Sequence, residues 1–291
     1  MNNRDYFSRR LAARKRTDKI FHFVFMGATG IGMALLLVLL ADICKEGIKY
    51  LDGQFLTSFP SRFPERAGIK SALAGTLWLI TLVAPLTFVF GVGTALFLEE
   101  FIPRKNIWNK IIQTNIANLA GVPSIIYGIL GLAVFVRMLA LGRSVLAGAL
   151  TMTLLILPIV IVAAQEAIRS VPVSMRHASF ALGATRWQTV RHVVFPSALP
   201  GILTGMILAV SRAIGETAPM IMIGSMAFVA FTPRNPLDYF TVLPIQIFNW
   251  TARPQDAFRE VAASGIVVLL AVLLATNALA VLLRNRYQKK S

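Results

Sequence analysis

Charged side chains are scarce in this chain of 291 residues. Only 14% of its residues are Asp, Glu, Lys or Arg and 56% are hydrophobic, whereas a soluble domain is about one-quarter charged. This shortage excludes an ordinary water-soluble globular domain. The charges that are present are mostly basic, with 29 Lys and Arg against 13 Asp and Glu. They are gathered at a few places instead of being spread over a surface.

Cysteine and the motifs of several enzyme classes are also missing. Cys44 is the single cysteine, which excludes an internal disulfide and a CxxC metal site. The sequence contains no G-x-x-x-x-G-K nucleotide loop, no H-E-x-x-H zinc motif and no G-x-S-x-G elbow. Nothing therefore predicts catalysis, ATP binding, a metal site or a cofactor in this chain itself. Its basic residues flank apolar stretches and do not alternate with aromatic residues on a solvated face, so we expect no nucleic-acid partner.

Long apolar runs are the dominant feature that the chain does have. Five charge-free stretches, each of at least 22 residues, occupy 20–41, 71–98, 111–136, 144–165 and 261–283. A bilayer core of about 30 Å needs roughly 20 apolar residues of helix, so each stretch is long enough to span it. The runs are continuous, without the alternation of a membrane β-strand. They predict an all-α polytopic membrane protein with six transmembrane helices, at 21–43, 71–98, 111–136, 144–165, 198–229 and 261–283.

Basic residues predict the orientation of these helices. The tails at 1–20 and 284–291, the segment after 98 and the loop at 166–197 together carry 18 of the 29 basic residues. By the positive-inside rule both termini and the 166–197 loop face the cytoplasm. The rest of the chain is predicted to comprise an extracytoplasmic loop at 44–70 and a transmembrane domain at 71–283. The first apolar stretch has no small-residue cleavage pattern after it, so we expect it to stay as an anchor.

The fifth span is the least regular one. Arg212 and Glu216 interrupt it, so 192–211 and 217–233 could be two short spans, but one interrupted span keeps the basic C-terminal tail on the cytoplasmic side. A continuous helix over 198–231 would be about 51 Å long, which exceeds the bilayer core. Pro219 and Gly224 are expected to break it. Whether the part after the break re-enters the membrane or packs outside stays open.

The 166–197 loop has the signals of two short helices. Pro172 suits the first turn of a helix, and Gly183 can adopt the left-handed conformation that ends one. Met175, Ala178, Ala181 and Leu182 form an apolar stripe at helical spacing. Thr185 and Gln188 have the spacing of a capping box for a second helix, which Pro196 is expected to close. Such a hairpin could be a structured loop only, or it could enter a groove on a partner.

The same loop resembles the EAA loop of the permease subunits of binding-protein-dependent ABC importers. That pattern is E-A-A, three residues, Gly, nine residues, then I-x-L-P, and here it becomes His177-Ala178-Ser179, then Gly183, then Val193 to Pro196. The spacing fits fully, whereas His177 and Ser179 depart from the pattern's identities. The resemblance implies a type I ABC importer permease fold with a cytoplasmic coupling helix that docks on a separate ATPase. The docking residues it implies are His177, Ala178, Ser179, Leu182, Gly183 and Ala184.

Further stretches narrow the resemblance to phosphate importers. GVPSIIYG at 121–128, SRAIGETAPM at 211–220 and the run from 181 to 202 closely resemble permeases of the phosphate-specific system. The likeness covers roughly residues 70–283. It implies a membrane subunit in the bacterial cytoplasmic membrane that forms half of a phosphate pathway. The implied partners are a cytoplasmic ATPase dimer, a second permease subunit and an extracytoplasmic phosphate-binding protein.

Arg212 and Glu216 are the candidate pathway residues. A single charge at a helix centre costs about 2.5–3.5 kcal/mol on the insertion scale, so two charges four residues apart are expected to pair. Beside them a small-residue stripe lets another helix approach closely; it consists of Gly201, Gly205, Ala209 and Ala213. An arginine fork matches the oxygens of phosphate. The pair could act in the transport path, or it could be a structural ion pair.

Two other functions are compatible with an arginine in a membrane span. Another tetrahedral oxyanion could be the substrate, because an Arg–Glu pair does not choose among such anions. A secondary anion transporter is disfavoured because no second broken helix corresponds to 198–233, as inverted repeats would require.

Overall fold

The computed structural model describes residues 3–103, 106–226 and 228–288. Arg104, Lys105, Lys289 and Lys290, which contributed to the predicted orientation, lie outside the described residues. Within these ranges the regular elements are helices, apart from one isolated bridge between Ser144 and Tyr239. The α-helices are α1 (Asn3–Gly47), α2 (Gly53–Thr57), α3 (Lys70–Thr87), α4 (Gly93–Leu96), α5 (Ile107–Ala120), α6 (Ser124–Gly131), α7 (Val145–Arg169), α8 (Val173–Ala181), α9 (Arg186–Thr189), α10 (Phe195–Gly215), α11 (Ala218–Ile223), α12 (Leu243–Thr251) and α13 (Ala257–Gln288). Two 3-10 turns, η1 (Ile48–Tyr50) and η2 (Pro64–Arg66), and four π-helical segments, η3 (Phe88–Val92), η4 (Phe97–Phe101), η5 (Leu132–Met138) and η6 (Val190–Val194), complete the set.

Five helices in the described part of the chain are long and apolar enough to cross a membrane. They are Thr17–Tyr50, Lys70–Phe101, Val145–Arg169, Arg186–Gly215 and Ala257–Arg286. Each contains one of the predicted spans or most of it. The prediction of an all-α polytopic membrane protein is therefore confirmed.

The predicted helix over 111–136 is wrong as a single helix. The structure has two helices there, Ile107–Ala120 and Ser124–Met138, which meet at an angle of 102°. Pro123 explains the break, because its ring disfavours helical geometry in the preceding residue and its own backbone is extended, with ψ 135°. Counted together, the bent pair gives the sixth span.

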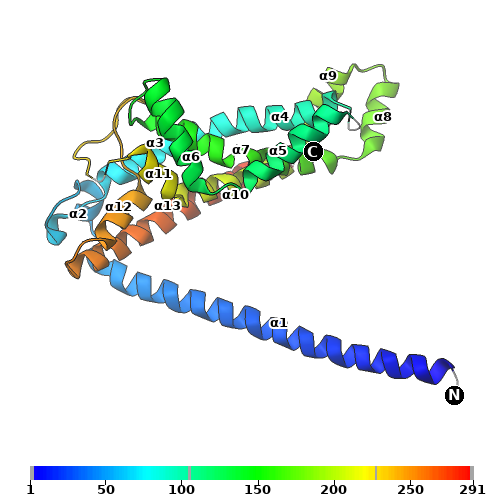
Figure 1. The fold of residues 1–291 in the computed structure, drawn as a ribbon, viewed down its shortest axis with the longest axis horizontal. Coiled ribbons are helices and arrows are strands. Elements are labelled where there is room, and N and C mark those ends of the chain that lie inside the picture. Colours follow the sequence, from blue (N-terminus) through cyan, green and yellow to red (C-terminus); the bar gives the residue numbers. More distant parts are fainter. Residues whose placement is uncertain (1–2, 104–105, 227, 289–291) are drawn as a thin grey trace.

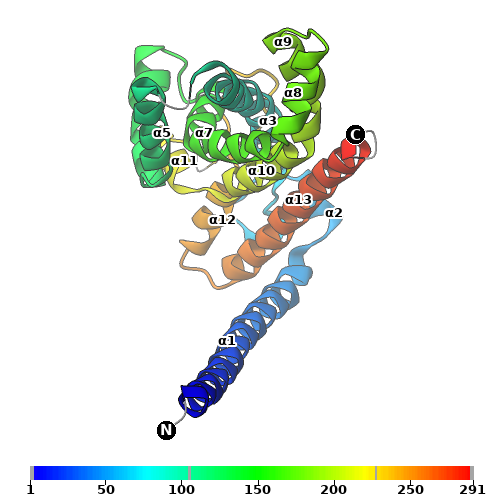
Figure 2. The same cartoon turned by 90° about the vertical axis from the view of Figure 1, so that its right-hand side faces the viewer.

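Helix α7 forms the centre of the bundle, with α3, α5, α6 and α10 packed around it (Figure 2). Its buried side chains include Ile156, Val160 and Ile168. Gly205 of α10 lies so close to α7 that a Cβ atom there would be 2.4 Å from the Cβ of Ala163. The small-residue stripe of α10 therefore allows close helix approach, as predicted.

Pro196 does not end the second helix of the 166–197 segment, contrary to the prediction. The helix runs without interruption from Arg186 to Gly215. Proline normally clashes with the carbonyl of the preceding turn. Here the wider π-helical turn η6 lies directly before it, and this wide turn accommodates the ring.

The chain breaks after α10, in the region where Pro219 and Gly224 were expected to interrupt the helix. The helix ends at Gly215, and Glu216 has an extended backbone with φ −77° and ψ 122°. Pro219 lies four residues beyond Gly215, so it cannot donate to that carbonyl. The short helix α11 follows and ends at Gly224, whose φ of 80° is left-handed. Helix α11 packs against α6, where a Cβ at Gly128 would be 2.7 Å from the Cα of Pro219.

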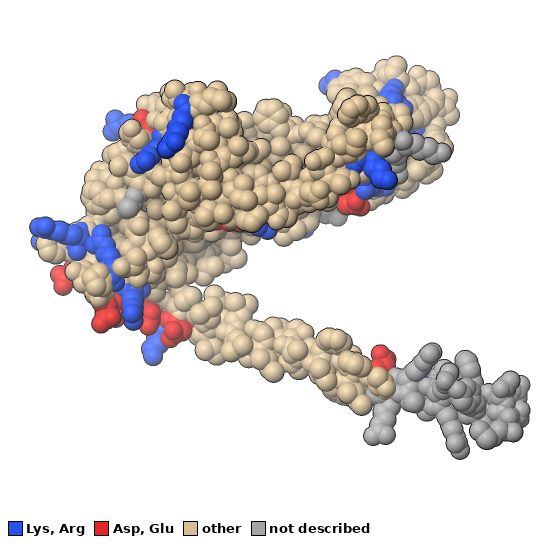
Figure 3. Space-filling view, in the orientation of Figure 1, with Lys and Arg blue, Asp and Glu red and all other residues tan. Residues whose placement is uncertain are grey.

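The ends of the molecule differ in what they carry. Helices α8 and α9 lie at one end, toward which the start of α1 and the end of α13 also point, and α2 and α12 lie at the other (Figure 1). On the face shown in Figure 3, charged residues gather toward the two ends of the body, and a mostly uncharged surface separates them. This distribution fits a protein whose middle faces hydrocarbon.

Helix α1 diverges from the rest of the bundle (Figure 1). No residue in the most apolar part of its membrane span is buried. It is attached at its C-terminal end, where the Ser264 hydroxyl of α13 donates to the Gly47 carbonyl at 2.7 Å. The first predicted span, 21–43, is therefore part of a helix that extends away from the bundle (Figure 1) and is attached to it near Gly47.

Candidate functional site: the coupling hairpin and the α10 ion pair

Residues 166–197 form a helical hairpin, which we call the coupling hairpin. Helix α8 ends in a turn where Gly183 has φ 80°, a conformation that glycine adopts without the steric cost of a side chain. The capping box of α9 is complete, since Thr185 N donates to Gln188 Oε1 at 2.8 Å and Gln188 N donates to Thr185 Oγ1 at 3.3 Å. The predictions for Gly183, Thr185 and Gln188 are confirmed.

Several large apolar side chains on the coupling hairpin are exposed in the described chain. No residue of α8 is buried, and Leu182 is 89% exposed. Four further large apolar side chains are exposed around it: Val173, Met175, Phe180 and Trp187. An apolar surface that projects beyond the membrane helices is typical of a protein–protein contact.

The six predicted docking residues fall into two groups. His177, Ala178, Leu182 and Gly183 are exposed. Ser179 and Ala184 are half-buried: the Ser179 hydroxyl lies 2.9 Å from Thr189 Oγ1, and Ala184 N donates to the Ser179 carbonyl at 3.2 Å. Ser179 therefore joins α8 to α9 through Thr189, and the Ala184 hydrogen bond closes the C-terminal turn of α8.

Replacing Thr185 with Ala is expected to loosen α9. Removing a helix N-cap costs about 1 kcal/mol, and hydrogen exchange of the α9 amides should become several-fold faster in the intact membrane protein. Thr185→Ser keeps the hydroxyl and should exchange like the wild type. Unchanged exchange in Thr185→Ala would contradict the role of the cap.

Arg176 joins the coupling hairpin to the end of the second span. Its guanidinium donates to Glu100 Oε1 at 2.8 Å, to the Val171 carbonyl at 2.6 Å and to the Ile168 carbonyl at 2.8 Å. The side chains of Arg176 and Glu100 are only 15% and 12% exposed. The Arg176 side chain thus caps carbonyls at the C-terminal end of α7. Through Glu100 it also attaches α8 to η4.

A second set of contacts lies beside it. Arg169 is 2.6 Å from Glu99 Oε1 and 2.9 Å from Glu166 Oε1. Gln165 also donates to Glu99 Oε1, at 3.1 Å. We call Glu99, Glu100, Arg169 and Arg176 the basal cluster. It connects the base of the coupling hairpin to the helix Lys70–Phe101.

Arg169 and Arg176 entered the predicted orientation only as basic residues of the 166–197 loop, and the basal cluster was not predicted. The sequence signal for this cluster is the combination of two acidic residues directly after one apolar span, Glu99 and Glu100, with two arginines shortly after another apolar span.

Arg212 and Glu216 form the predicted ion pair, with Arg212 Nε 3.2 Å from Glu216 Oε1. Glu216 follows the last residue of α10 instead of lying within the helix. The Arg212 side chain is 57% exposed and that of Glu216 is 18% exposed. Leu208, one turn earlier, is 68% exposed. The pair therefore lies on an open face of a membrane helix, where Arg212 can meet a ligand or a second chain.

These features define a membrane subunit with a bundle of spanning helices and a projecting hairpin suited to docking. Residues 88–289 match the family model described as "Binding-protein-dependent transport system inner membrane component". The chain belongs to this family of ABC importer permeases, which are transport components and not enzymes.

Relatives and solved structures agree with this assignment. The chain is 33% identical to "Probable ABC transporter permease protein YqgI" of Bacillus subtilis, with 95% of this chain and 98% of that protein covered. It is 32% identical to "Phosphate transport system permease protein PstA 1" of Mycobacterium tuberculosis H37Rv (76% and 71% covered). It is 30% identical to "Probable phosphate transport system permease protein PstA" of Methanocaldococcus jannaschii (89% and 90% covered).

Among solved structures, a chain of a bacterial alginate ABC transporter in complex with its periplasmic protein has a TM-score of 0.66 at 15% identity, with 91% of this chain and 93% of that chain covered. A chain of the MetNI methionine ABC transporter has a TM-score of 0.61 at 18% identity, with 74% and 94% covered. The fold is therefore that of a type I ABC importer permease, as predicted.

Proposed function

We propose that this chain is one permease subunit of an ATP-driven inorganic phosphate importer and forms half of its translocation pathway. The observation that carries the proposal is the exposed Arg212 guanidinium on a membrane helix, held from one side by Glu216. An arginine fork meets phosphate oxygens with aligned, charge-assisted hydrogen bonds. The Glu216 carboxylate lowers the local positive potential, so the anion can leave again. The relatives named as phosphate permeases support this substrate.

The proposed partners follow from the two exposed surfaces. A cytoplasmic dimer of ATP-binding subunits would take the coupling hairpin, and a second, PstC-like permease would face Arg212. An extracytoplasmic phosphate-binding protein would deliver the anion at the end that carries α2 and α12. In this orientation the coupling hairpin and both termini are cytoplasmic.

In the proposed mechanism the coupling hairpin moves as a rigid unit when the ATPases close. The basal cluster transmits this motion to the helix Lys70–Phe101, and the unbroken helix Arg186–Gly215 transmits it to Arg212. Rigid-body motion of two permeases then changes the side on which the pathway is open.

Purification of the complex from native membranes followed by uptake in reconstituted vesicles tests the proposal. We expect an ATPase and a second permease to co-purify, and labelled phosphate to accumulate only when ATP is present. Competition by molybdate or phosphonate at equal concentration would point to another oxyanion. Uptake that persists without the ATPase would point to a secondary transporter and overturn the proposal.

Replacing Arg212 with Leu should lower ATP-dependent phosphate uptake by about tenfold to a hundredfold, because a hydrogen bond to a charged group contributes about 1.5–3 kcal/mol. Arg212→Lys keeps the charge without the fork and should retain part of the activity. Normal uptake in a stable Arg212→Leu complex would remove Arg212 from the pathway. If Arg212→Leu prevents assembly and Arg212→Leu with Glu216→Leu restores it, the pair is structural.

A further inference from the structure

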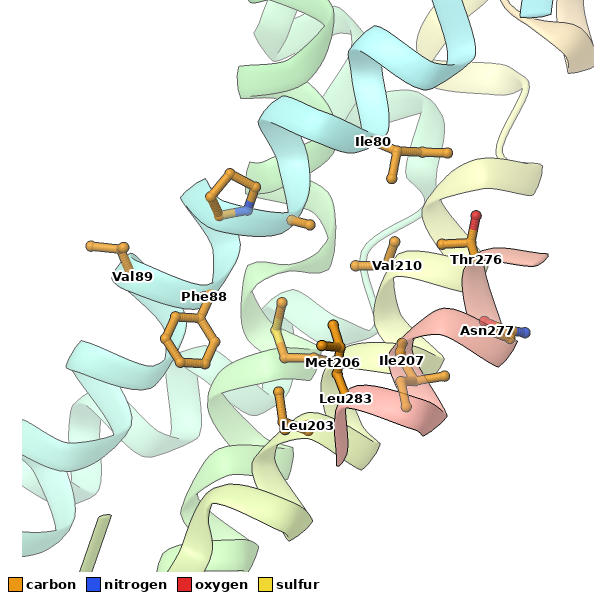
Figure 4. Close-up of a pocket in the computed structure, with 13 residues that line it drawn as sticks. Ile80, Phe88, Val89, Leu203, Met206, Ile207, Val210, Thr276, Asn277 and Leu283 are labelled. Carbon is orange, nitrogen blue, oxygen red and sulfur yellow. The ribbon is translucent and has the colours of Figure 1, made fainter. Parts of the chain in front are cut away.

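An apolar groove lies on the outside of the bundle between α3, α10 and α13 (Figure 4). Its volume is about 340 Å³. Ala84 of α3, Phe88 at the start of η3, Leu203 and Met206 of α10, and Ala280 and Leu283 of α13 are among the side chains that line it. Along α13 the lining extends from Thr276 to Leu283, which is roughly 10 Å of helix.

Two polar side chains line the groove, and each makes a hydrogen bond within the protein. Thr276 donates to the Val272 carbonyl at 2.8 Å, and Asn277 Oδ1 accepts a hydrogen bond from the Ser211 hydroxyl. The remaining lining is aliphatic or aromatic. The groove therefore offers little to a polar solute and suits a hydrocarbon chain.

The groove is separate from the proposed phosphate pathway. Leu203 lines the groove, and Arg212 follows it nine residues later on the same helix. Nine residues are two and a half turns at about 3.6 residues per turn, so the two side chains lie on opposite faces of α10. Whatever fills the groove does not occupy the site of Arg212.

A basic side chain lies at one end of the groove. Arg284 is one turn beyond Ala280 on α13, and its guanidinium reaches Thr204, the neighbour of Leu203, at 3.3 Å. Its other contact is the Asn285 side-chain oxygen at 3.3–3.4 Å. No carboxylate pairs with Arg284 among the residues that the structure describes. A half-buried cation near the end of a membrane helix, held by neutral groups at the long end of hydrogen-bond distances, favours an anion.

We infer that this groove binds an anionic phospholipid of the surrounding membrane, with an acyl chain along α3, α10 and α13 and the headgroup phosphate at Arg284. The apolar lining accounts for the chain, and the uncompensated guanidinium accounts for the charge of the headgroup. Bound in this position, the lipid joins three helices of different spans and fixes α13 against the moving helix α10. This binding is independent of which anion is transported.

Native mass spectrometry of the assembled transporter tests the inference. The complex is taken from lipid nanodiscs that contain equal amounts of phosphatidylglycerol and phosphatidylcholine. The wild type should retain phosphatidylglycerol at least fivefold over phosphatidylcholine. Arg284→Gln should reduce this preference to near parity, and Arg286→Gln, an exposed arginine two residues later, should leave it unchanged. Ala280→Trp fills the groove and should reduce retention of both lipids.

Three results would overturn the inference. The first is equal retention of both lipids by the wild type. The second is an equal effect of Arg284→Gln and Arg286→Gln, which would indicate general attraction to a basic helix end. The third is efficient disulfide crosslinking between Ala280→Cys and a cysteine placed within 20–41 of a neighbouring chain, in a Cys44→Ser background, since a protein helix would then fill the groove.

Discussion

Replacing Arg176 with Leu is expected to lower ATP-dependent uptake by at least 30-fold while ATP hydrolysis by the attached ATPase changes far less. The substitution leaves the Glu100 carboxylate, only 12% exposed, without its partner. Breaking a buried ion pair from one side costs about 3–5 kcal/mol. It also removes the donors of the Val171 and Ile168 carbonyls, so α8 loses its attachment to α7 and η4. Parallel measurement of uptake and hydrolysis in reconstituted vesicles checks the result.

Two comparisons separate this positioning role from a general loss of basic charge. Arg191 is exposed on the same hairpin and has no carboxylate partner within the described chain, so Arg191→Leu should change uptake less than twofold. Arg176→Leu combined with Glu100→Leu removes the unpaired carboxylate and should recover part of the stability but little of the coupling. Hydrogen exchange over 173–181 should accelerate in both Arg176 variants. Wild-type exchange and uptake in Arg176→Leu would contradict the role.

Local signals were readable from the sequence because the groups involved are neighbours in the chain. Gly183 takes the left-handed conformation expected at a helix end, and Thr185 and Gln188 form the expected capping box. The Arg212–Glu216 contact was predictable for the same reason, since four residues separate the two. In each case the residues involved are only a few positions apart in the chain, so the feature does not depend on long-range packing.

The errors have a different origin. Pro196 was expected to end a helix, but the π-helical turn η6 before it tolerates the ring. The bend at Pro123 is not visible in hydropathy, because both arms of the bent pair are apolar. The basal cluster joins residues 76 positions apart, Glu100 and Arg176, and no pattern within one helix indicates such a contact. The two proline effects depend on local backbone geometry that hydropathy does not report, whereas the basal cluster depends on the packing of segments that are distant in the sequence.

Replacing Leu182 with Asp should weaken binding of the ATPase about a hundredfold without changing the fold of the permease. Leu182 is 89% exposed in the isolated chain, so the substitution removes almost no internal packing. Burial of a leucine contributes about 1.5–3 kcal/mol, and a carboxylate at the centre of an apolar contact adds a desolvation cost. A loss of about 2.7 kcal/mol corresponds to a hundredfold in affinity. Affinity of the purified permease pair for the ATPase in detergent provides the measurement.

The matched control is Leu237→Asp. Leu237 is also exposed, at 62%, but it lies in the segment between α11 and α12, and this segment is at the opposite end of the molecule (Figure 1). The same change of leucine to a carboxylate should leave ATPase affinity within twofold of the wild type. Thermal unfolding of both permease variants should match the wild type, because neither side chain is packed. Equal ATPase affinity for Leu182→Asp and wild type would place the docking surface elsewhere than on the coupling hairpin. The mechanism would then lose the contact through which ATP hydrolysis reaches α10.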